Sequence, residues 1–176
     1  MKAGLLVTGL GFAMGASNAN AALSAHEFDG NAVNYCQAFT PGPANTIRNR
    51  AVGAENVGTV PINIACSWHS TFGDFGATNP TSLDVNFYNN TNAPMTVTCS
   101  MFNGYQTQGG TGQYLSTKST ATMAPHTQAD ILWDSTSNPN TGATDLGNNL
   151  ININCTLPPG AVVNDTYLYW MQDNGV

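Results

Sequence analysis

Apolar and polar residues alternate along several stretches of the chain, which is the pattern of β-strands with one buried face. The clearest stretches are 60–68, 83–88, 95–101 and 151–157. A further stretch, 166–171, is aromatic on both faces, and weaker strands are expected at 113–117, 119–123 and 129–133. No segment shows a convincing helical period, so the pattern predicts an all-β protein.

Clusters of Gly, Pro and Asn separate these stretches and predict turns. Short strands punctuated in this way predict one domain, an antiparallel β-sandwich of about 7–8 strands. The segment 40–58 has no periodic pattern and is expected to be a long irregular connection. The final run, 167–171, is expected to form an edge strand unless another element covers it.

The N-terminal 21 residues have the features of a secretory signal. Lys2 precedes an apolar run, and the small residues Ala19-Asn20-Ala21 form a cleavage site. Cleavage after Ala21 leaves residues 22–176 as the predicted domain. No later stretch approaches the roughly 18 apolar residues of a spanning helix, so no transmembrane segment is expected after cleavage. The predicted location is secreted or periplasmic.

Four cysteines follow the predicted signal: Cys36, Cys66, Cys99 and Cys155. An even number in an exported chain predicts two disulfides, and the absence of any CxxC spacing argues against zinc. Three connectivities are open. Cys99 and Cys155 occupy matching places in two similar strands, which favours Cys99–Cys155 and therefore Cys36–Cys66.

The composition limits the classes of partner. Only 8% of residues are charged, and four basic against ten acidic residues give a net charge of −6. The chain has too few cations to neutralise a phosphate backbone, so nucleic-acid binding is excluded. The polar surface is expected to consist mainly of Asn, Thr, Ser and Gly, which suits an uncharged partner.

Several of these elements follow one another in a fixed order along the chain. The early Cys36 is followed by the strand 60–66 ending at Cys66, the strand Asp84-Val85-Asn86-Phe87-Tyr88 and the third Cys strand. The late Cys155-Thr156-Leu157-Pro158-Pro159 then leads into an aromatic last strand. In this layout the chain resembles an uncharacterised family of small, disulfide-bonded β-sandwiches. The resemblance implies the fold and export, and it transfers no catalytic residue.

Aromatic residues give the main binding hypothesis. Tyrosines and tryptophans, Tyr167 and Tyr169 among them, can stack on sugar rings while neighbouring amides bind hydroxyl groups. The candidate ligand-binding residues are Tyr105, Tyr114 and Trp133, and the expected ligand is a neutral polysaccharide. The alternative is that the tryptophans are core residues, as expected for Trp68, which shares the apolar face of its strand.

One loop suggests a calcium site, the only cofactor expected. Its oxygen-bearing side chains are Asp134, Asn138, Asn140 and Asp145, and Ca²⁺ prefers such ligands. The spacing is not that of an EF-hand, and an ordinary surface loop is the alternative.

No catalytic residue is assigned. His26, His69 and His126 are present, but the sequence has no nucleophile elbow, phosphate loop or HExxH motif. The favoured function is an exported non-enzymatic binding or surface-interaction module, with carbohydrate as the ligand. A structural or assembly component of the cell envelope, with another envelope protein as its partner, is the alternative. A small secreted hydrolase is a more remote one.

Overall fold

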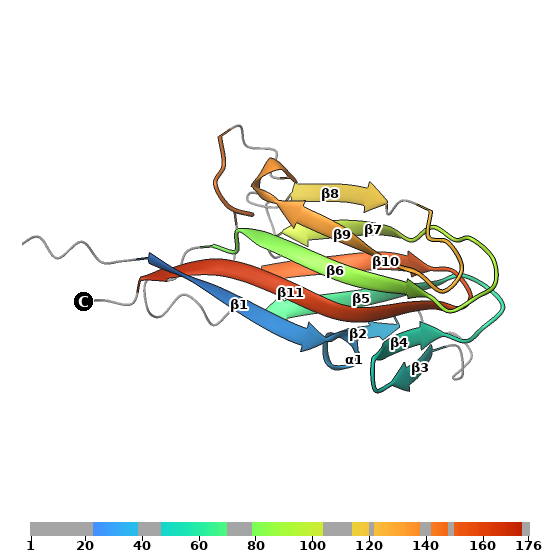
Figure 1. Ribbon diagram of the computed structural model, residues 1–176. Helices are drawn as coiled ribbons and strands as arrows, with labels where there is room; N and C mark the ends of the chain where they lie inside the picture. The colour runs from blue at the N-terminus through green and yellow to red at the C-terminus, as the bar shows by residue number, and fades with distance from the viewer. Residues whose placement is uncertain are drawn as a thin grey trace, which may run out of the picture.

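The structure is a computed structural model that describes residues 23–38, 47–69, 79–103, 114–119, 122–137, 142–147 and 150–173. These residues form eleven strands in two antiparallel sheets, which lie one over the other in Figure 1. The predicted β-sandwich is confirmed, with more strands than the sequence pattern indicated.

One layer is a six-stranded sheet built around the last strand. Its order is β3 (Ile47–Arg50), β4 (Gly53–Asn56), β11 (Ala161–Asp173), β6 (Ser82–Asn89) and β9 (Gln128–Asp134). β1 (Leu23–Asn31) also pairs with β11, along the part that β4 leaves open. β11 therefore has neighbours along both of its edges, so other elements cover the final strand and it is not an edge.

The other layer is a five-stranded sheet. Its order is β2 (Cys36–Ala38), β5 (Ile62–His69), β10 (Leu150–Leu157), β7 (Thr98–Asn103) and β8 (Tyr114–Ser119). The described part of the chain adds a single-turn helix, α1 (Ala32–Tyr35), and a 3-10 turn, η2 (Ser135–Ser137). Neither of these two helices is long enough to cross a bilayer.

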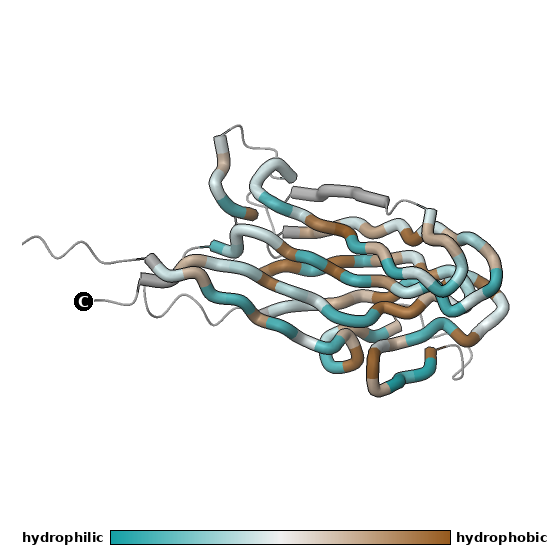
Figure 2. The backbone as a smooth tube through the Cα atoms, viewed as in Figure 1, coloured by the Kyte–Doolittle hydropathy of each residue, from teal (hydrophilic) through white to brown (hydrophobic). Residues whose placement is uncertain are grey.

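The core lies between the two sheets and consists of every second residue of the main strands. Figure 2 shows hydrophobic and hydrophilic positions alternating along them. β6 and β10 follow the alternation closely: Leu83, Val85 and Phe87 are fully buried, and so are Ile151 and Cys155. Burial of such side chains contributes roughly 1.5–3 kcal/mol each, which makes this layer the main source of stability.

A polar contact also crosses the core. Trp68 on β5 is 3% exposed, and its Nε1 donates to Thr166 Oγ1 on β11 over 3.2 Å. The same hydroxyl donates to Gly30 O on β1 over 3.0 Å. Trp68 is thus a core residue with its one polar atom satisfied, as the core interpretation of this tryptophan predicts.

Both disulfides have the expected pairing, Cys36–Cys66 and Cys99–Cys155. Each joins directly opposed residues of neighbouring strands, β2 with β5 and β7 with β10. Both bonds therefore lie within the five-stranded sheet, and neither crosses to the other layer.

The N-terminal part of the sandwich differs from the expectation. β3 and β4 form a hairpin inside the segment 40–58, where an irregular connection was predicted. β1 and β2 were not predicted. Of the weak strand expected at 119–123, Ser119 ends β8, Met123 forms an isolated bridge with Met95, and 120–121 lie outside the described residues. These strands have mixed or short patterns, and pairing with a neighbour rather than alternation holds them in place.

Candidate functional site

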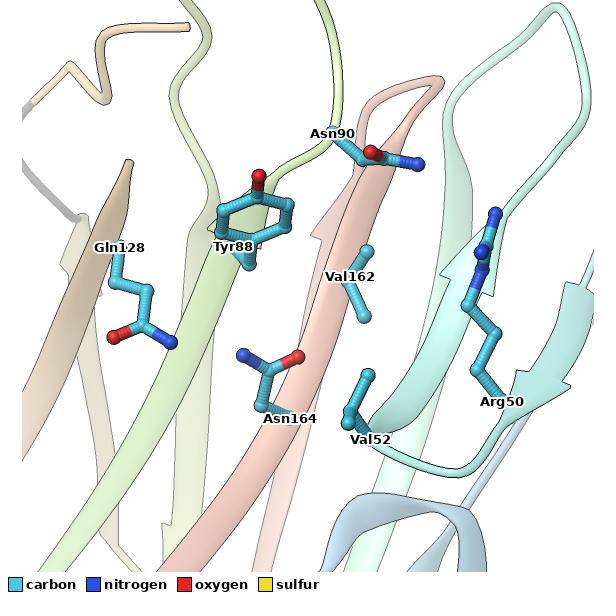
Figure 3. A pocket seen from close by; sticks show the side chains of 7 residues that line it. All are labelled: Arg50, Val52, Tyr88, Asn90, Gln128, Val162 and Asn164. Atoms are coloured by element: carbon cyan, nitrogen blue, oxygen red, sulfur yellow. The ribbon is translucent and has the colours of Figure 1, made fainter. Parts of the chain in front are cut away.

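A pocket of about 280 Å³ lies on the outer face of the six-stranded sheet (Figure 3). Side chains from β3, β6, β9 and β11 and the adjoining turns surround it. The residues that line it are Arg50, Val52, Tyr88, Asn90, Gln128, Val162 and Asn164. Pockets that bury drug-sized ligands have roughly 300–1,000 Å³, so this one has room for a single ring.

Two backbone irregularities shape the pocket. β11 carries a bulge between Val163 and Thr166, where its register with β6 shifts, and Asn164 lies in this bulge. Gly53 then allows the β3–β4 hairpin to approach the bulge, because a Cβ at Gly53 would lie 2.2 Å from Val163 O. Its φ of 152° is also a conformation that other residues rarely adopt. The hairpin consequently brings Arg50 and Val52 beside the pocket.

A buried carboxylate fixes the polar side of the pocket. Glu55 on β4 is 4% exposed and accepts hydrogen bonds from Arg48, Arg50 and Asn90. The distances are 2.9 Å from Arg48 Nη2 to Oε2 and 2.6 Å from Asn90 Nδ2 to Oε1. Burial by itself raises the pKa of Glu55, but the three donors outweigh it and hold that pKa below its usual range. Glu55 therefore stays ionised and orients two of the pocket's polar side chains.

One hydrogen-bond acceptor in the pocket wall has no partner. Asn164 is only 7% exposed, and its Oδ1 accepts no hydrogen bond from the described residues. Figure 3 shows its amide among Tyr88, Val162 and Val52. Leaving such a buried group unsatisfied costs about 1–3 kcal/mol. A ligand hydroxyl or amine at this point would remove that cost.

The same outer face continues away from the pocket as an acidic face, defined here by Glu27, Asp29, Asp84, Asp130 and Asp165. Half of the ten acidic residues of the chain are gathered in it. The strand registers alternate these carboxylates with tyrosines: Asp29 and Asp84 flank Tyr167, and Glu27 is opposite Tyr169. Directly opposed side chains in a sheet have Cβ atoms about 4.5–5.5 Å apart, so the groups interact.

The electrostatics of the acidic face show that its carboxylates repel one another. Burial and the neighbouring Asp130 raise the pKa of Asp84, and burial and Asp29 raise the pKa of Asp165. Burial and the surrounding carboxylates also raise the pKa of Tyr167 and of Tyr169, which in addition donates a hydrogen bond to Glu27. The face thus keeps negative charges together at a cost in stability.

We expect Asp84→Asn to raise the melting temperature at about pH 7, where the carboxylate is ionised. A raised folded-state pKa means that stability falls as pH rises from the unfolded pKa to the folded one, and asparagine removes that loss. At about pH 3, below both pKa values, the two proteins should melt at similar temperatures. Asn86→Asp, which places a carboxylate opposite Asp130, should lower the melting temperature at about pH 7. A destabilised Asp84→Asn protein at neutral pH would contradict the repulsion.

A second hollow, of about 410 Å³, lies beside α1, β2 and β5. Tyr35 is the aromatic residue in its wall, and the ring of Tyr35 already packs edge-on against Phe28 with centroids 5.3 Å apart. The hydroxyl of Ser67, another wall residue, donates to Asn152 Oδ1. With these groups engaged, the hollow is a weaker candidate than the pocket at Tyr88.

The structure corrects one of the three aromatic candidates. Trp133 is 0% exposed and belongs to the core between the sheets, because it lies on the inward side of β9. Tyr105 lies outside the described residues. Tyr114 begins β8, and its side chain also lies outside what the structure describes. Tyr167 and Tyr169, by contrast, lie on the outer face of β11.

The calcium candidates are partly described. Asp134 Oδ1 accepts from Thr136 N and Oγ1, and Asp145 Oδ1 accepts from Gly147 N over 2.6 Å. Both carboxylates thus stabilise local turns, while Asn138 and Asn140 lie outside the described residues. The described residues contain no group of three His, Cys, Asp or Glu side chains that could hold a metal ion. Calcium binding by this loop stays a prediction.

The structure describes the side-chain contacts of two of the three histidines. His26 lies on β1, where its ring stacks on Trp170 with centroids 5.7 Å apart and Nε2 is 2.9 Å from Ser24 Oγ. His126 Nε2 is 3.0 Å from Asn92 Oδ1, on an exposed turn. The side chain of His69 lies outside the described residues. Neither described histidine is placed against an acid in a way that suggests a catalytic triad.

Comparison with known proteins assigns no family to the chain. No family model matches the chain, and no curated protein matches it. Among solved structures, the chain is similar to TmCBM61 in complex with beta-1,4-galactotriose, with 6% identity over 84% of both chains and a TM-score of 0.32. It is also similar to a structure described as "CBM4 structure and function", with 10% identity over 81% of both chains and a TM-score of 0.31. Likenesses of this size assign neither a family nor a ligand to the chain.

Proposed function

We propose that this protein is a non-enzymatic binding module that holds one ring of a polysaccharide in the pocket at Tyr88. The observation that carries the proposal is the composition of the pocket wall. An aromatic ring and two valines adjoin three amides and a fixed guanidinium, and a buried acceptor lacks a donor. A sugar ring offers the matching surface, with apolar C–H groups on its faces and hydroxyl groups around its rim.

Each part of the wall has a role in this proposal. Tyr88 and Val162 would contact the apolar face of the ring, while Gln128 and Arg50 would bind hydroxyl groups at its edge. Asn164 Oδ1 would accept a hydrogen bond from a further hydroxyl. Because Glu55 already orients Arg50, little side-chain freedom is lost when the ligand binds.

The proposal also includes the location of the protein. Two disulfides form and persist in oxidising surroundings, which supports a secreted or periplasmic protein. Such compartments are where a cell meets polysaccharides. The charge of Arg50 is paired with Glu55, and the rest of the wall is uncharged, which favours a neutral ring over a sulfated or carboxylated one.

Affinity electrophoresis in gels that contain individual polysaccharides tests the proposal. We expect retardation by at least one polysaccharide and its loss in Tyr88→Ala, because alanine removes the stacking surface. By comparison, loss of a base stacked on an aromatic side chain costs about 1–3 kcal/mol, or roughly 5-fold to 150-fold in affinity, and we expect a loss of this size here. Tyr88→Phe, which retains the ring, should keep most of the retardation.

The matched control is Phe102→Ala. Phe102 is 44% exposed on the outer face of the five-stranded sheet, so its removal deletes an exposed aromatic ring far from the pocket. It should leave retardation unchanged. Unaltered mobility of the wild-type protein in every gel would overturn the proposal and leave envelope assembly as the alternative. Concentration-dependent oligomers in sedimentation would then support that alternative.

A further inference from the structure

The pocket and the acidic face belong to one continuous surface. Asn164 lines the pocket, and the next residue, Asp165, is the first carboxylate of the acidic face. Along β11, Asp165 is followed on the same face by Tyr167 and Tyr169. Asp84 on β6 and Asp29 on β1 lie on either side of Tyr167. A polymer with one ring in the pocket therefore has the acidic face beside it.

Charge is distributed unevenly over the two sides of the sandwich. On the outer face of the five-stranded sheet, the described side chains of β5, β7 and β10 are uncharged, chiefly Asn, Ser and Thr. On the six-stranded sheet, the described cations of β3, Arg48 and Arg50, both pair with Glu55. Among the described side chains, no cation forms an ion pair with the five carboxylates of the acidic face.

We infer that the bound polysaccharide carries free amino groups, with one ring over Tyr88 and Asn164 and the protonated amines of the following rings along the acidic face. This inference rests on the proposed function and names the ligand class of the same site. Two buried atoms point to the ligand independently of the charge count. Asn164 Oδ1, in a side chain more than nine-tenths buried, faces the pocket without a donor, and Asp84 Oδ1 on the acidic face accepts no hydrogen bond from described residues.

The chemistry selects amines over other charge carriers. An ammonium group supplies both the hydrogen-bond donor that these oxygens lack and the positive charge that relieves the repulsion between Asp84 and Asp130. A neutral polysaccharide supplies donors but leaves the repulsion in place. A polysaccharide with carboxylate or sulfate groups would add to it.

Glycol chitosan and fully N-acetylated glycol chitosan form a matched pair of probes, because they share one backbone and differ in the amine. We expect the amine polymer to bind the wild-type protein about tenfold more tightly at low salt, the sum of a few exposed ion pairs of roughly 0.2–1 kcal/mol each. Salt at about 1 M, where the screening length is near 3 Å, should abolish most of the difference.

Variants assign the preference to the acidic face. The double variant Asp84→Asn with Asp165→Asn should reduce the preference to about twofold and leave binding of the acetylated polymer unchanged. Asp145→Asn removes one carboxylate outside both sheets and should keep the full preference. Tyr88→Ala should weaken binding of both polymers.

The possible outcomes separate the inference from the proposed function. Equal, Tyr88-dependent binding of the two polymers would overturn the inference while supporting the proposed function. Binding of the amine polymer that ignores Tyr88→Ala would show simple ion exchange and overturn the inference. No binding of either polymer, or of any other polysaccharide, would overturn both.

Discussion

The double variant Cys99→Ala with Cys155→Ala is expected to melt roughly 8–16 °C below the wild-type protein. The bond joins residues 56 positions apart, and closing a loop of that length removes about 4 kcal/mol of conformational freedom from the unfolded chain. Both cysteines are fully buried at the centre of the five-stranded sheet, where β7 and β10 pair. Thermal denaturation followed by circular dichroism measures the change.

The matched control is the double variant Cys36→Ala with Cys66→Ala. This bond closes a shorter separation of 30 residues and holds β2, a three-residue strand at the edge of the same sheet. A smaller loss is expected, because less of the sheet depends on β2. If the Cys99 and Cys155 variant melted within a degree or so of the wild type, the stabilising role assigned to that bond would be wrong.

Asn89→Ala is expected to destabilise the protein by about 3 kcal/mol. Asn89 ends β6 and is fully buried, and its Nδ2 lies 2.8–3.2 Å from the carbonyl oxygens of Ala93, Met123 and Ala124. Its Oδ1 accepts from Thr91 N and Oγ1. Alanine would remove the hydrogen-bond partner of these backbone and hydroxyl groups, both in the turn after β6 and in the turn before β9. Urea denaturation, with the midpoint and slope both fitted, measures the loss.

A second asparagine of the same turn provides the control. Asn92 is exposed, and its described contact is with His126 Nε2 at 3.0 Å. Asn92→Ala should change the free energy of unfolding by less than about 0.5 kcal/mol. Equal losses for the two variants would mean that the turn tolerates alanine anywhere and that burial of Asn89 has no special role.

The strands with strict alternation could be predicted from the sequence, and the others could not. β6 and β10 bury one face and expose the other, so the pattern of residues alone reveals them. β4 is buried at all four positions and contains Gly53, Glu55 and Asn56, which no periodic template recognises. β1 was missed because its inward side includes Ser24, His26 and Gly30, which are not apolar.

The disulfide pairing was predictable for a physical reason. Cys99 and Cys155 stand at matching places in two similar alternating strands, and such strands pair in register. The pocket was not predictable in this way, because its residues come from four strands and the adjoining turns. Its shape also depends on the bulge at Asn164 and on Gly53, which only the register between β4, β6 and β11 reveals.

The aromatic hypothesis was right about the class of residue and wrong about one position. Ile131, Leu132 and Trp133 form an apolar run without alternation, so the sequence left open which side of β9 faces the core. The larger side chain takes the inward side, where it buries more apolar area. An acidic face could not be predicted, since its carboxylates are scattered over β1, β6, β9 and β11 and meet only after folding.

The pairing of β1 with β11 has a consequence for how the chain folds. The first described strand and the last lie side by side over nine residue pairs, from Leu23 with Asp173 to Asn31 with Asp165. Nearly the whole chain must therefore be present before the six-stranded sheet can close, and contacts this far apart in sequence slow folding. Until β11 has been made, β1 has no strand to pair with. A protein with this topology folds after synthesis or transport has finished rather than strand by strand, and it is most exposed to proteases and to chaperones in that interval.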